Sequence, residues 1–532
     1  MQRKHSFVWN TLILTAAGGI ARVLGAVYRI FLSRMIGDDG IGLFQMAYDL
    51  SFVFMTVAIS GLPQAVSKLI AERRENGDEQ GIQIMLRASL IASGVIGSIG
   101  ALGIYFGAPL LIDYNLHEPR ALLALQCIAP SLLFIFLMAP LRGYFQGLQQ
   151  MVPRALSDTI EQIARVIAIV ILVWMARGNS VEYAAAGATL GVSIGAGLAW
   201  VYLLIAYWRR DKTVSATTAS EQPSEGMLAA LRHIVDVAIP IVLGSLIWPL
   251  MRLVDTMLIH TRLMVAGLTA ERATELFGQF SGQAGPLVNL PSILTVALSA
   301  SLLPSIAGAM ARRDGATMRQ QTNLALKLSL VIGLPAAVGL NMLATPVAQF
   351  LYVNAEAGSV IAAYSWVICF LLLYQASTSI LQGVGKLMPP VVAMLCGVAV
   401  KAVLTYILCA RPDIHVLGAG WATAIGMAVA VAINLGVIYV QMQVPFDRRG
   451  LVFAPAFATL AMVGVLFLGY APLASFFRGA MIPLFISIAV GALVYGIVLL
   501  AAGAFSRSEL QAIPKIGIIM LNVLDKLNLV KD

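Results

Sequence analysis

Charged side chains inside long apolar stretches are the residues of this sequence that could do chemistry. Eight of them interrupt otherwise apolar runs: Arg22, Arg29, Asp49, Glu161, Arg165, Arg252, Asp255 and Lys401. A charge at the bilayer centre costs on the order of 2.5–3.5 kcal/mol on insertion scales, so such groups face a partner or a cavity. Arginine forms forked hydrogen bonds with phosphate oxygens. Since five of the eight are cations, a shared cavity would suit an anionic ligand such as a diphosphate.

Four of these groups, in two pairs, also have a simple interpretation as ion pairs within one helix. Glu161 and Arg165 are four residues apart, a spacing that places both side chains on one helix face. Asp255 follows Arg252 by three residues, which has the same effect. In either pair the charges could neutralise each other without any ligand.

The remaining intramembrane charges differ in how easily a partner can be named. Arg29 and Asp49 fall near the same end of adjacent apolar runs, so they could form a clasp between two helices. Arg22 and Lys401 have no same-helix partner at their depth. They are therefore the stronger candidates for a ligand site.

The elements that must position these charges are membrane-spanning helices. Of 532 residues, 59% are hydrophobic and 11% charged, against roughly a quarter charged in soluble domains. Apolar runs of about 18 or more residues recur, and each can cross a hydrocarbon core as a helix. We therefore predict an all-α polytopic membrane protein of about fourteen spans. The predicted spans are 7–36, 41–67, 84–107, 121–142, 153–176, 182–207, 234–260, 286–308, 324–350, 359–383, 389–410, 418–441, 451–470 and 481–503.

The positive charges indicate an orientation rather than a nucleic-acid partner. The net charge is +9, but most Lys and Arg residues lie in short segments on the same side as both termini. This is the positive-inside pattern, so we expect both termini in the cytoplasm of a bacterial cell with the protein in its inner membrane. The first apolar run extends to about residue 36 and contains two arginines, so we interpret it as an uncleaved span.

A polar linker and a polar tail divide the chain into five segments. The linker contains Arg209-Arg210-Asp211-Lys212, and the tail has an apolar stripe typical of a helix lying on a membrane surface. The expected segments are an N-lobe (1–207), a cytoplasmic linker (208–232), a C-lobe (233–441), two further spans (442–503) and an amphipathic tail (504–532).

The two lobes have similar sequence features, which indicates an internal duplication. Gln-Gly, five residues and Pro follow the fourth span at 146–153 and the tenth span at 382–389. Twelve residues after each proline, a single cation lies inside the next span: Arg165 in one case and Lys401 in the other. We therefore expect two parallel six-helix lobes with pseudo-symmetry.

Several blocks resemble the stage V sporulation protein B group, which belongs with the MurJ-like lipid II flippases in the multidrug/oligosaccharidyl-lipid/polysaccharide exporter superfamily. The first block begins Ala-Arg-Val-Leu-Gly-Ala-Val-Tyr-Arg and is followed by Gly-Ile-Gly-Leu-Phe-Gln-Met-Ala-Tyr. The resemblance covers nearly the whole chain. Its blocks are 21–37, 40–48, 61–69, 142–147, 161–165, 289–291 and 301–304.

The resemblance implies a central cavity between two lobes, alternating access, and a hydrophobic groove from spans thirteen and fourteen for a lipid tail. Arg22 matches a cavity arginine of MurJ-type proteins. Tyr28 stands where those proteins carry a second arginine, with Arg29 beside it, and Gly285-Pro286 stands where they carry an acidic–basic pair. The cationic site is therefore expected to be arranged differently, through Arg252 and Lys401.

These observations together predict a flippase, not an enzyme, that moves undecaprenyl-diphosphate-linked peptidoglycan precursor (lipid II) outward. The expected substrate-binding residues are Arg22, Arg29, Asp49, Arg165, Arg252, Asp255 and Lys401. The alternatives are a flippase for another lipid-linked polysaccharide unit and a drug/cation antiporter. We expect no cofactor or metal; a coupling cation stays open. Membrane lipids are expected partners, and cell-wall synthesis proteins and a role in sporulation also stay open.

Overall fold

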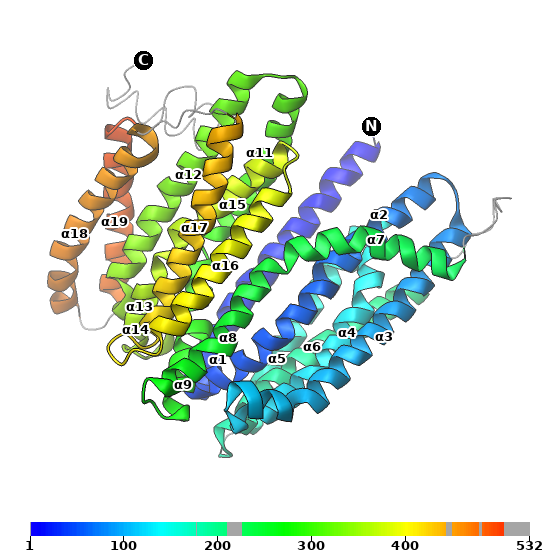
Figure 1. Cartoon of the computed structure of the whole chain (residues 1–532), viewed down its shortest axis with the longest axis horizontal. Helices are drawn as coiled ribbons and strands as arrows, with labels where there is room; N and C mark the ends of the chain where they lie inside the picture. Colours follow the sequence, from blue (N-terminus) through cyan, green and yellow to red (C-terminus); the bar gives the residue numbers. More distant parts are fainter. Residues whose placement is uncertain (1, 177, 210–225, 443–448, 478–480, 505–532) are drawn as a thin grey trace. The chain divides into compact units, whose positions relative to one another are not determined.

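The computed structural model describes residues 2–176, 178–209, 226–442, 449–477 and 481–504, and these residues form helices without any β-strand (Figure 1). Side chains before Gly25 are outside the description, among them that of Arg22. By compactness the chain divides into two units, residues 1–278 and 279–532. The expected all-α class is confirmed.

The first unit contains nine helices within the described residues. They are α1 (Gln2–Thr56), α2 (Leu62–Glu75), α3 (Glu79–Leu111), α4 (Leu122–Gly147), α5 (Met151–Met175), α6 (Val181–Trp208), α7 (Met227–Ser245), α8 (Ile247–Val265) and α9 (Ala270–Phe277). Here α7 packs on α2 and α3, and α8 packs on α1. These contacts lie within the first unit, which ends at residue 278. The predicted linker (208–232) and C-lobe (233–441) stay predictions.

The second unit contains ten helices within the described residues. They are α10 (Gly285–Asn289), α11 (Ser292–Ala311), α12 (Gly315–Met342), α13 (Ala344–Tyr352), α14 (Ala357–Ser365), α15 (Val367–Gly383), α16 (Met388–Leu408), α17 (Leu417–Met442), α18 (Ala454–Phe476) and α19 (Met481–Ala501). Helices α18 and α19 lie side by side, and α18 packs on α12.

Eleven helical stretches in the described residues are long and apolar enough to cross a membrane, judged by length and composition. They account for all predicted spans except 7–36, 153–176 and 286–308. Those three coincide with the first part of α1, with α5 and with α11. In α5, every 18-residue stretch contains at least Asp158, Glu161 and Arg165, and this number of charges makes its span weak by composition. About fourteen spans are therefore compatible with the structure.

The longest helix, α1, bends at a single glycine. Gly37 has φ 69° and ψ −176° inside a 55-residue helix. A side chain with a β-carbon is strained at such a positive φ, so glycine is the residue that permits the bend. The bend lies between the first two predicted spans. Arg29 comes before the bend and Asp49 after it, and both belong to α1.

In each unit, one pair of helices packs closely where a glycine of one helix faces a cationic residue of the other. In α5 and α6, a β-carbon added at Gly195 would lie 2.8 Å from Cβ of Arg165. In α16 and α17, one added at Gly426 would lie 3.0 Å from Cβ of Lys401. The cations that the repeat pattern matched therefore occupy similar packing positions, which supports the predicted duplication.

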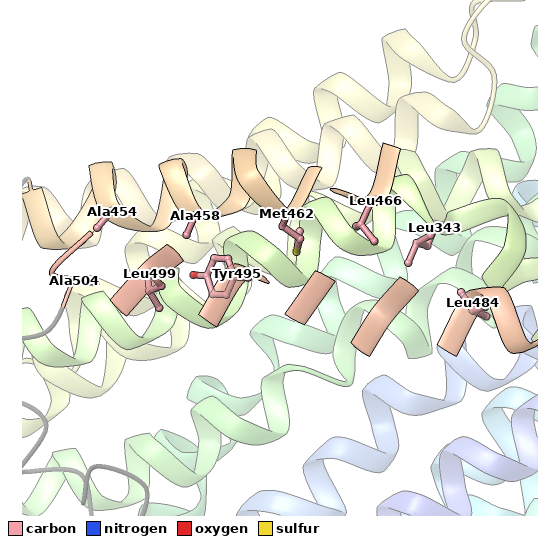
Figure 2. Packing of buried hydrophobic residues seen from close by; sticks show 9 residues of the cluster. All are labelled: Leu343, Ala454, Ala458, Met462, Leu466, Leu484, Tyr495, Leu499 and Ala504. Atoms are coloured by element: carbon pink, nitrogen blue, oxygen red, sulfur yellow. The ribbon is translucent and has the colours of Figure 1, made fainter. Parts of the chain in front are cut away.

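An apolar core joins α18 and α19 to α12. Its members include Leu343, Met462, Leu466, Tyr495 and Leu499, all buried (Figure 2). The Tyr495 hydroxyl donates to the Val331 carbonyl at 2.8 Å, which satisfies the one polar atom of this large side chain.

Candidate functional site

A buried ion-pair network joins α4 and α5 inside the first unit. Glu161 accepts from Arg142 at 2.8 Å through one oxygen and from Arg165 through the other. Arg142 also contacts Asp158 at 3.0 Å and donates to the Ser157 hydroxyl at 3.1 Å. One carboxylate between two arginines leaves a net charge of one positive unit. Asp158, whose side chain is more exposed, neutralises this charge through its contact with Arg142. The predicted Glu161–Arg165 pair is thus present, and Arg142 extends it.

The network continues electrostatically toward α1. Arg165 lies within charge-interaction range of Tyr28, Tyr48 and Arg29. The Arg29 guanidinium lies over the Tyr48 ring, 5.6 Å from its centroid. Arg29 and Arg165, far apart in sequence, are therefore brought to the same region of the first unit.

A second ion pair joins α1 to α8. Arg252 Nη2 lies 2.6 Å from Oδ1 of Asp49, and the same oxygen accepts from the Gln45 amide at 2.7 Å. The Asp49 side chain is 0% exposed, whereas that of Arg252 is 20% exposed. Arg252 also lies 5.4 Å from the centre of the Phe52 ring. The carboxylate is thus hidden behind the cation, so the accessible charge of this pair is positive.

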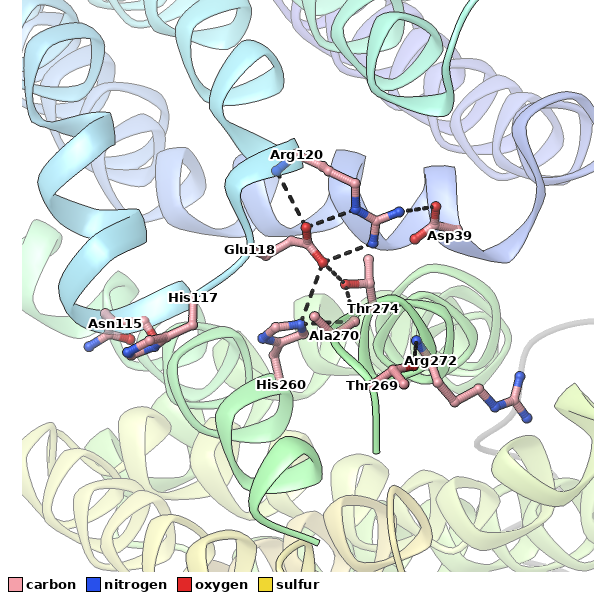
Figure 3. Close-up of polar contacts among 10 residues, drawn as sticks. All are labelled: Asp39, Asn115, His117, Glu118, Arg120, His260, Thr269, Ala270, Arg272 and Thr274. Carbon is pink, nitrogen blue, oxygen red and sulfur yellow. Dashed lines mark hydrogen bonds and ion pairs between the residues drawn. The ribbon is translucent and has the colours of Figure 1, made fainter. Parts of the chain in front are cut away.

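A third polar group, the Glu118 cluster, joins the segment just before α4 to α1, α8 and α9 near the bend of α1 (Figure 3). It consists of Asp39, Glu118, Arg120, His260 and Thr274. Arg120 bridges Glu118 at 2.8 and 2.9 Å and Asp39 at 2.7 Å. Thr274 donates to Glu118 at 2.8 Å, and His260 Nε2 lies 3.8 Å from the same carboxylate. One buried carboxylate therefore connects four chain segments.

The balance of forces on Glu118 favours its charged form. Burial raises the pKa of this carboxyl. Hydrogen bonds from Arg120 and Thr274, together with the nearby positive charge, lower the pKa by more than burial raises it, so the pKa of Glu118 is below its ordinary value. A carboxylate whose hydrogen bonds all favour its anion is a stable ionic link. The cluster therefore fixes the α1 bend to α8 and α9 while Glu118 is charged.

The second unit supplies an apolar groove between α12, α18 and α19. Its volume is about 480 Å³, and Pro335, Gly339, Met462, Ile488 and Gly491 are among its lining residues. Small residues on α12 and α19 leave the space open. Such a surface suits a hydrocarbon chain and offers little to a charged group.

The structure assigns the predicted site residues to different places. Arg29, Asp49, Arg165 and Arg252 gather in the first unit, where Asp255 is 5% exposed on the same helix as Arg252. Lys401 is 1% exposed in the second unit. That Lys401 and Arg22 share a chamber with the others stays a prediction.

Sequence reasoning missed two sets of residues that contact these charges. Arg142 is the last residue of the predicted span 121–142, where a basic residue is typical of the cytoplasmic end, yet it is buried against Glu161. The aromatic rings under Arg29 and Arg252 belong to Tyr48 and Phe52, which with Phe44 recur at i, i+4 spacing and do not stand out by residue type in an apolar helix. That spacing was the available signal.

Comparison with known protein families places this architecture. The model of the family described as "Polysaccharide biosynthesis protein" matches residues 7–310, and the MatE model matches residues 282–407. The first match covers more than half of the chain. The chain belongs to the polysaccharide biosynthesis protein family.

Relatives of this family member are known in Bacillus subtilis (strain 168). The chain is 30% identical to stage V sporulation protein B over 517 residues, which cover 97% of this chain and 99% of that protein. It is 28% identical to the lipid II flippase MurJ over 467 residues, 83% and 84% of the two chains. The expected membership in the stage V sporulation protein B group is confirmed.

Solved structures show the same fold as this family member. The lipid II flippase MurJ in an inward closed conformation has a TM-score of 0.71 at 18% identity, covering 92% of this chain and 98% of that chain. An inward-facing multidrug resistance MATE family transporter of the MOP superfamily has a TM-score of 0.68 at 16% identity, covering 80% and 94%. The protein is thus a multi-pass membrane protein with the fold of transporters.

Proposed function

We propose that this protein is a flippase that moves an undecaprenyl-diphosphate-linked peptidoglycan precursor, lipid II, from the inner to the outer leaflet of the bacterial cytoplasmic membrane. Both termini face the cytoplasm, and two lobes alternate access to the head group. Similarity to the lipid II flippase MurJ supports this cargo. Stage V sporulation protein B, to which identity is 30%, leaves a related lipid-linked saccharide as the second candidate.

The observation that carries the proposal is the pair of accessible arginines on α1 and α8. Arg29 and Arg252 are partly exposed, while Asp49 beside them is buried at 0% exposure. A guanidinium presents five N–H donors in a planar fork that matches phosphate oxygens. Inside an apolar protein these groups attract a phosphorylated head group more strongly than they would in water.

The groove between α12, α18 and α19 supports a role for a lipid tail. It is lined almost wholly by aliphatic side chains, and its volume of about 480 Å³ accommodates part of a long isoprenoid. Burying apolar surface stabilises a complex by about 25 cal/mol per Å². A drug/cation antiporter would favour an acidic site over the partly exposed arginines found here, so it is the weaker alternative.

Complementation tests the proposed cargo. The chain is expressed in a bacterium depleted of its own lipid II flippase, with membrane levels followed by immunoblotting. We expect the wild type to restore growth, and Arg22→Ala, Arg252→Ala and Lys401→Ala each to reduce it. Lys68→Ala, at a side chain 63% exposed, is the matched control and should grow like the wild type.

The outcomes separate the candidates. Failure of the well-expressed wild type to restore growth would exclude lipid II and favour another lipid-linked saccharide. Full growth with all three alanine variants would contradict the assignment of these cations to the head-group site.

A further inference from the structure

Three aromatic rings form a row along one face of α1. Phe44 and Tyr48 stack with centroids 5.7 Å apart and planes 22° from parallel, and Tyr48 and Phe52 stack at 5.8 Å and 19°. Residues four apart lie on the same helix face, about 6 Å along the axis. The aromatic row, Phe44–Tyr48–Phe52, is therefore continuous over two helical turns.

Two guanidinium groups from different segments lie over this row. Arg29, from the part of α1 before the bend, lies 5.6 Å from the Tyr48 centroid. Arg252, from α8, lies 5.4 Å from the Phe52 centroid. Both distances are within the roughly 6 Å over which a ring face attracts a cation. Successive rings of one row therefore each hold one cation.

Stacking on the aromatic row restricts the orientation of the guanidinium groups, which ion pairing alone does not do. An arginine side chain has many rotamers, and stacking on a ring restricts the plane of its fork while its edge N–H groups stay available. Asp49 accepts from one nitrogen of Arg252, so the ion pair anchors that end of the fork. The second cation, Arg29, lies over the neighbouring ring, whose centroid is 5.8 Å from that of Phe52.

We propose that the aromatic row sets the spacing of Arg29 and Arg252 so that they grip two linked phosphates, which makes Tyr48 and Phe52 positioning residues for a diphosphate head group. This inference rests on the proposed function and adds the device that distinguishes a diphosphate from a monophosphate. A ligand with one phosphate engages one fork, whereas a diphosphate engages both. Preorganised forks lose less freedom on binding, which raises affinity for the matching ligand.

The test is a binding measurement on purified full-length protein in detergent with two probes, undecaprenyl diphosphate and undecaprenyl monophosphate. We expect the wild type to bind the diphosphate at least tenfold more tightly. Tyr48→Leu and Phe52→Leu keep an apolar side chain but remove the ring, and each should weaken diphosphate binding by about 2- to 30-fold. Monophosphate binding should change little, so the preference falls.

Control variants separate positioning from packing. Phe44→Leu changes the same row at a ring that is 1% exposed, and it should preserve the preference for diphosphate. Tyr48→Phe and Phe52→Tyr keep an aromatic ring, so both should retain the preference for diphosphate. Each variant must give the wild-type elution profile on size exclusion, which excludes misfolding as the cause.

The possible results distinguish an error in the proposed cargo from an error in the positioning role of the aromatic row. If the wild type shows no preference for diphosphate, the proposed diphosphate-linked cargo is wrong. If the wild type prefers diphosphate and the leucine variants keep that preference, the cargo stands and the positioning role of the row is wrong. Equal losses for both probes would also contradict positioning, because they indicate general damage.

Discussion

At the scale of single residues, the charges of this membrane protein differ in how they are compensated. Glu161 is shared by Arg142 and Arg165, while Asp49 serves Arg252 and Gln45. Removing one partner of a buried ion pair leaves an uncompensated charge, which is far more costly than losing a pair at the surface. The buried network is therefore expected to matter for folding and the accessible arginines for ligand binding.

Substitution of Glu161 tests the structural role of the buried network. Glu161→Gln removes the carboxylate that pairs with Arg165 and leaves Arg142 with the less buried Asp158, so we expect the free energy of unfolding to fall by about 3–5 kcal/mol. The matched control is Glu72→Gln, in a pair with Lys68 whose side chains are 55% and 63% exposed, with an expected loss of at most about 1 kcal/mol. Thermal denaturation in detergent measures both. Equal melting temperatures for the two variants would contradict the buried network's role.

The Glu118 cluster predicts a pH dependence of stability. The folded-state pKa of Glu118 is lowered, so its contribution is present above the ordinary value of 4.5 and is lost as pH falls through the lower folded value. We expect the melting temperature of the wild type to drop in this acidic window. Glu118→Gln should be less stable than the wild type at neutral pH and should lose less on acidification. Parallel pH profiles for both proteins would exclude this role.

At the scale of elements, close helix contacts depend on the absence of a side chain. The α5–α6 contact at Gly195 meets Arg165, and the α16–α17 contact at Gly426 meets Lys401 and the Gly397 carbonyl. Interiors are close-packed, so an added methyl group must displace a neighbour. The two cations therefore lie where their helix pairs approach closely.

Alanine at these glycines should separate the helix pairs. Gly195→Ala puts a β-carbon 2.8 Å from Cβ of Arg165 and from the Glu161 carbonyl, so we expect a loss of about 1–3 kcal/mol of stability. Gly103→Ala in α3 is the control, because nothing lies within 4 Å of the new atom. Alanine favours helix over glycine, so the control should be neutral or stabilising. If Gly195→Ala leaves the stability unchanged, the two helices can move apart at no cost and the close contact does not contribute to stability.

At the scale of the whole molecule, the topology is predicted from the charge distribution and can be tested by labelling. In a variant without native cysteines, Tyr114→Cys lies at a site 81% exposed between α3 and α4, and Asn76→Cys lies at an exposed site between α2 and α3. With both termini in the cytoplasm, an impermeant maleimide should label position 114 in intact cells. Position 76 should react only after permeabilisation. Labelling of position 76 in intact cells would reverse the orientation.

Much of the architecture could be predicted from the sequence because a bilayer imposes simple rules on it. Apolar runs long enough to cross the membrane must be helical, since nothing in lipid satisfies a bare backbone. The i, i+4 spacing of Glu161 and Arg165 likewise fixes a contact within one helix, and the structure confirms that pair. The described helices match the predicted spans for the same reason.

Contacts between helices were decided only by the tertiary structure. Sequence spacing relates Asp49 to Arg29 and Arg252 to Asp255, and the structure adds an ion pair between Asp49 and Arg252 of α8 that spacing does not predict. Helical periodicity fixes which side chains share a face of one helix, and it contains no information on which helix faces another. The packing of α8 on α1 decides that Arg252, far from Asp49 in sequence, joins Gln45 at that carboxylate.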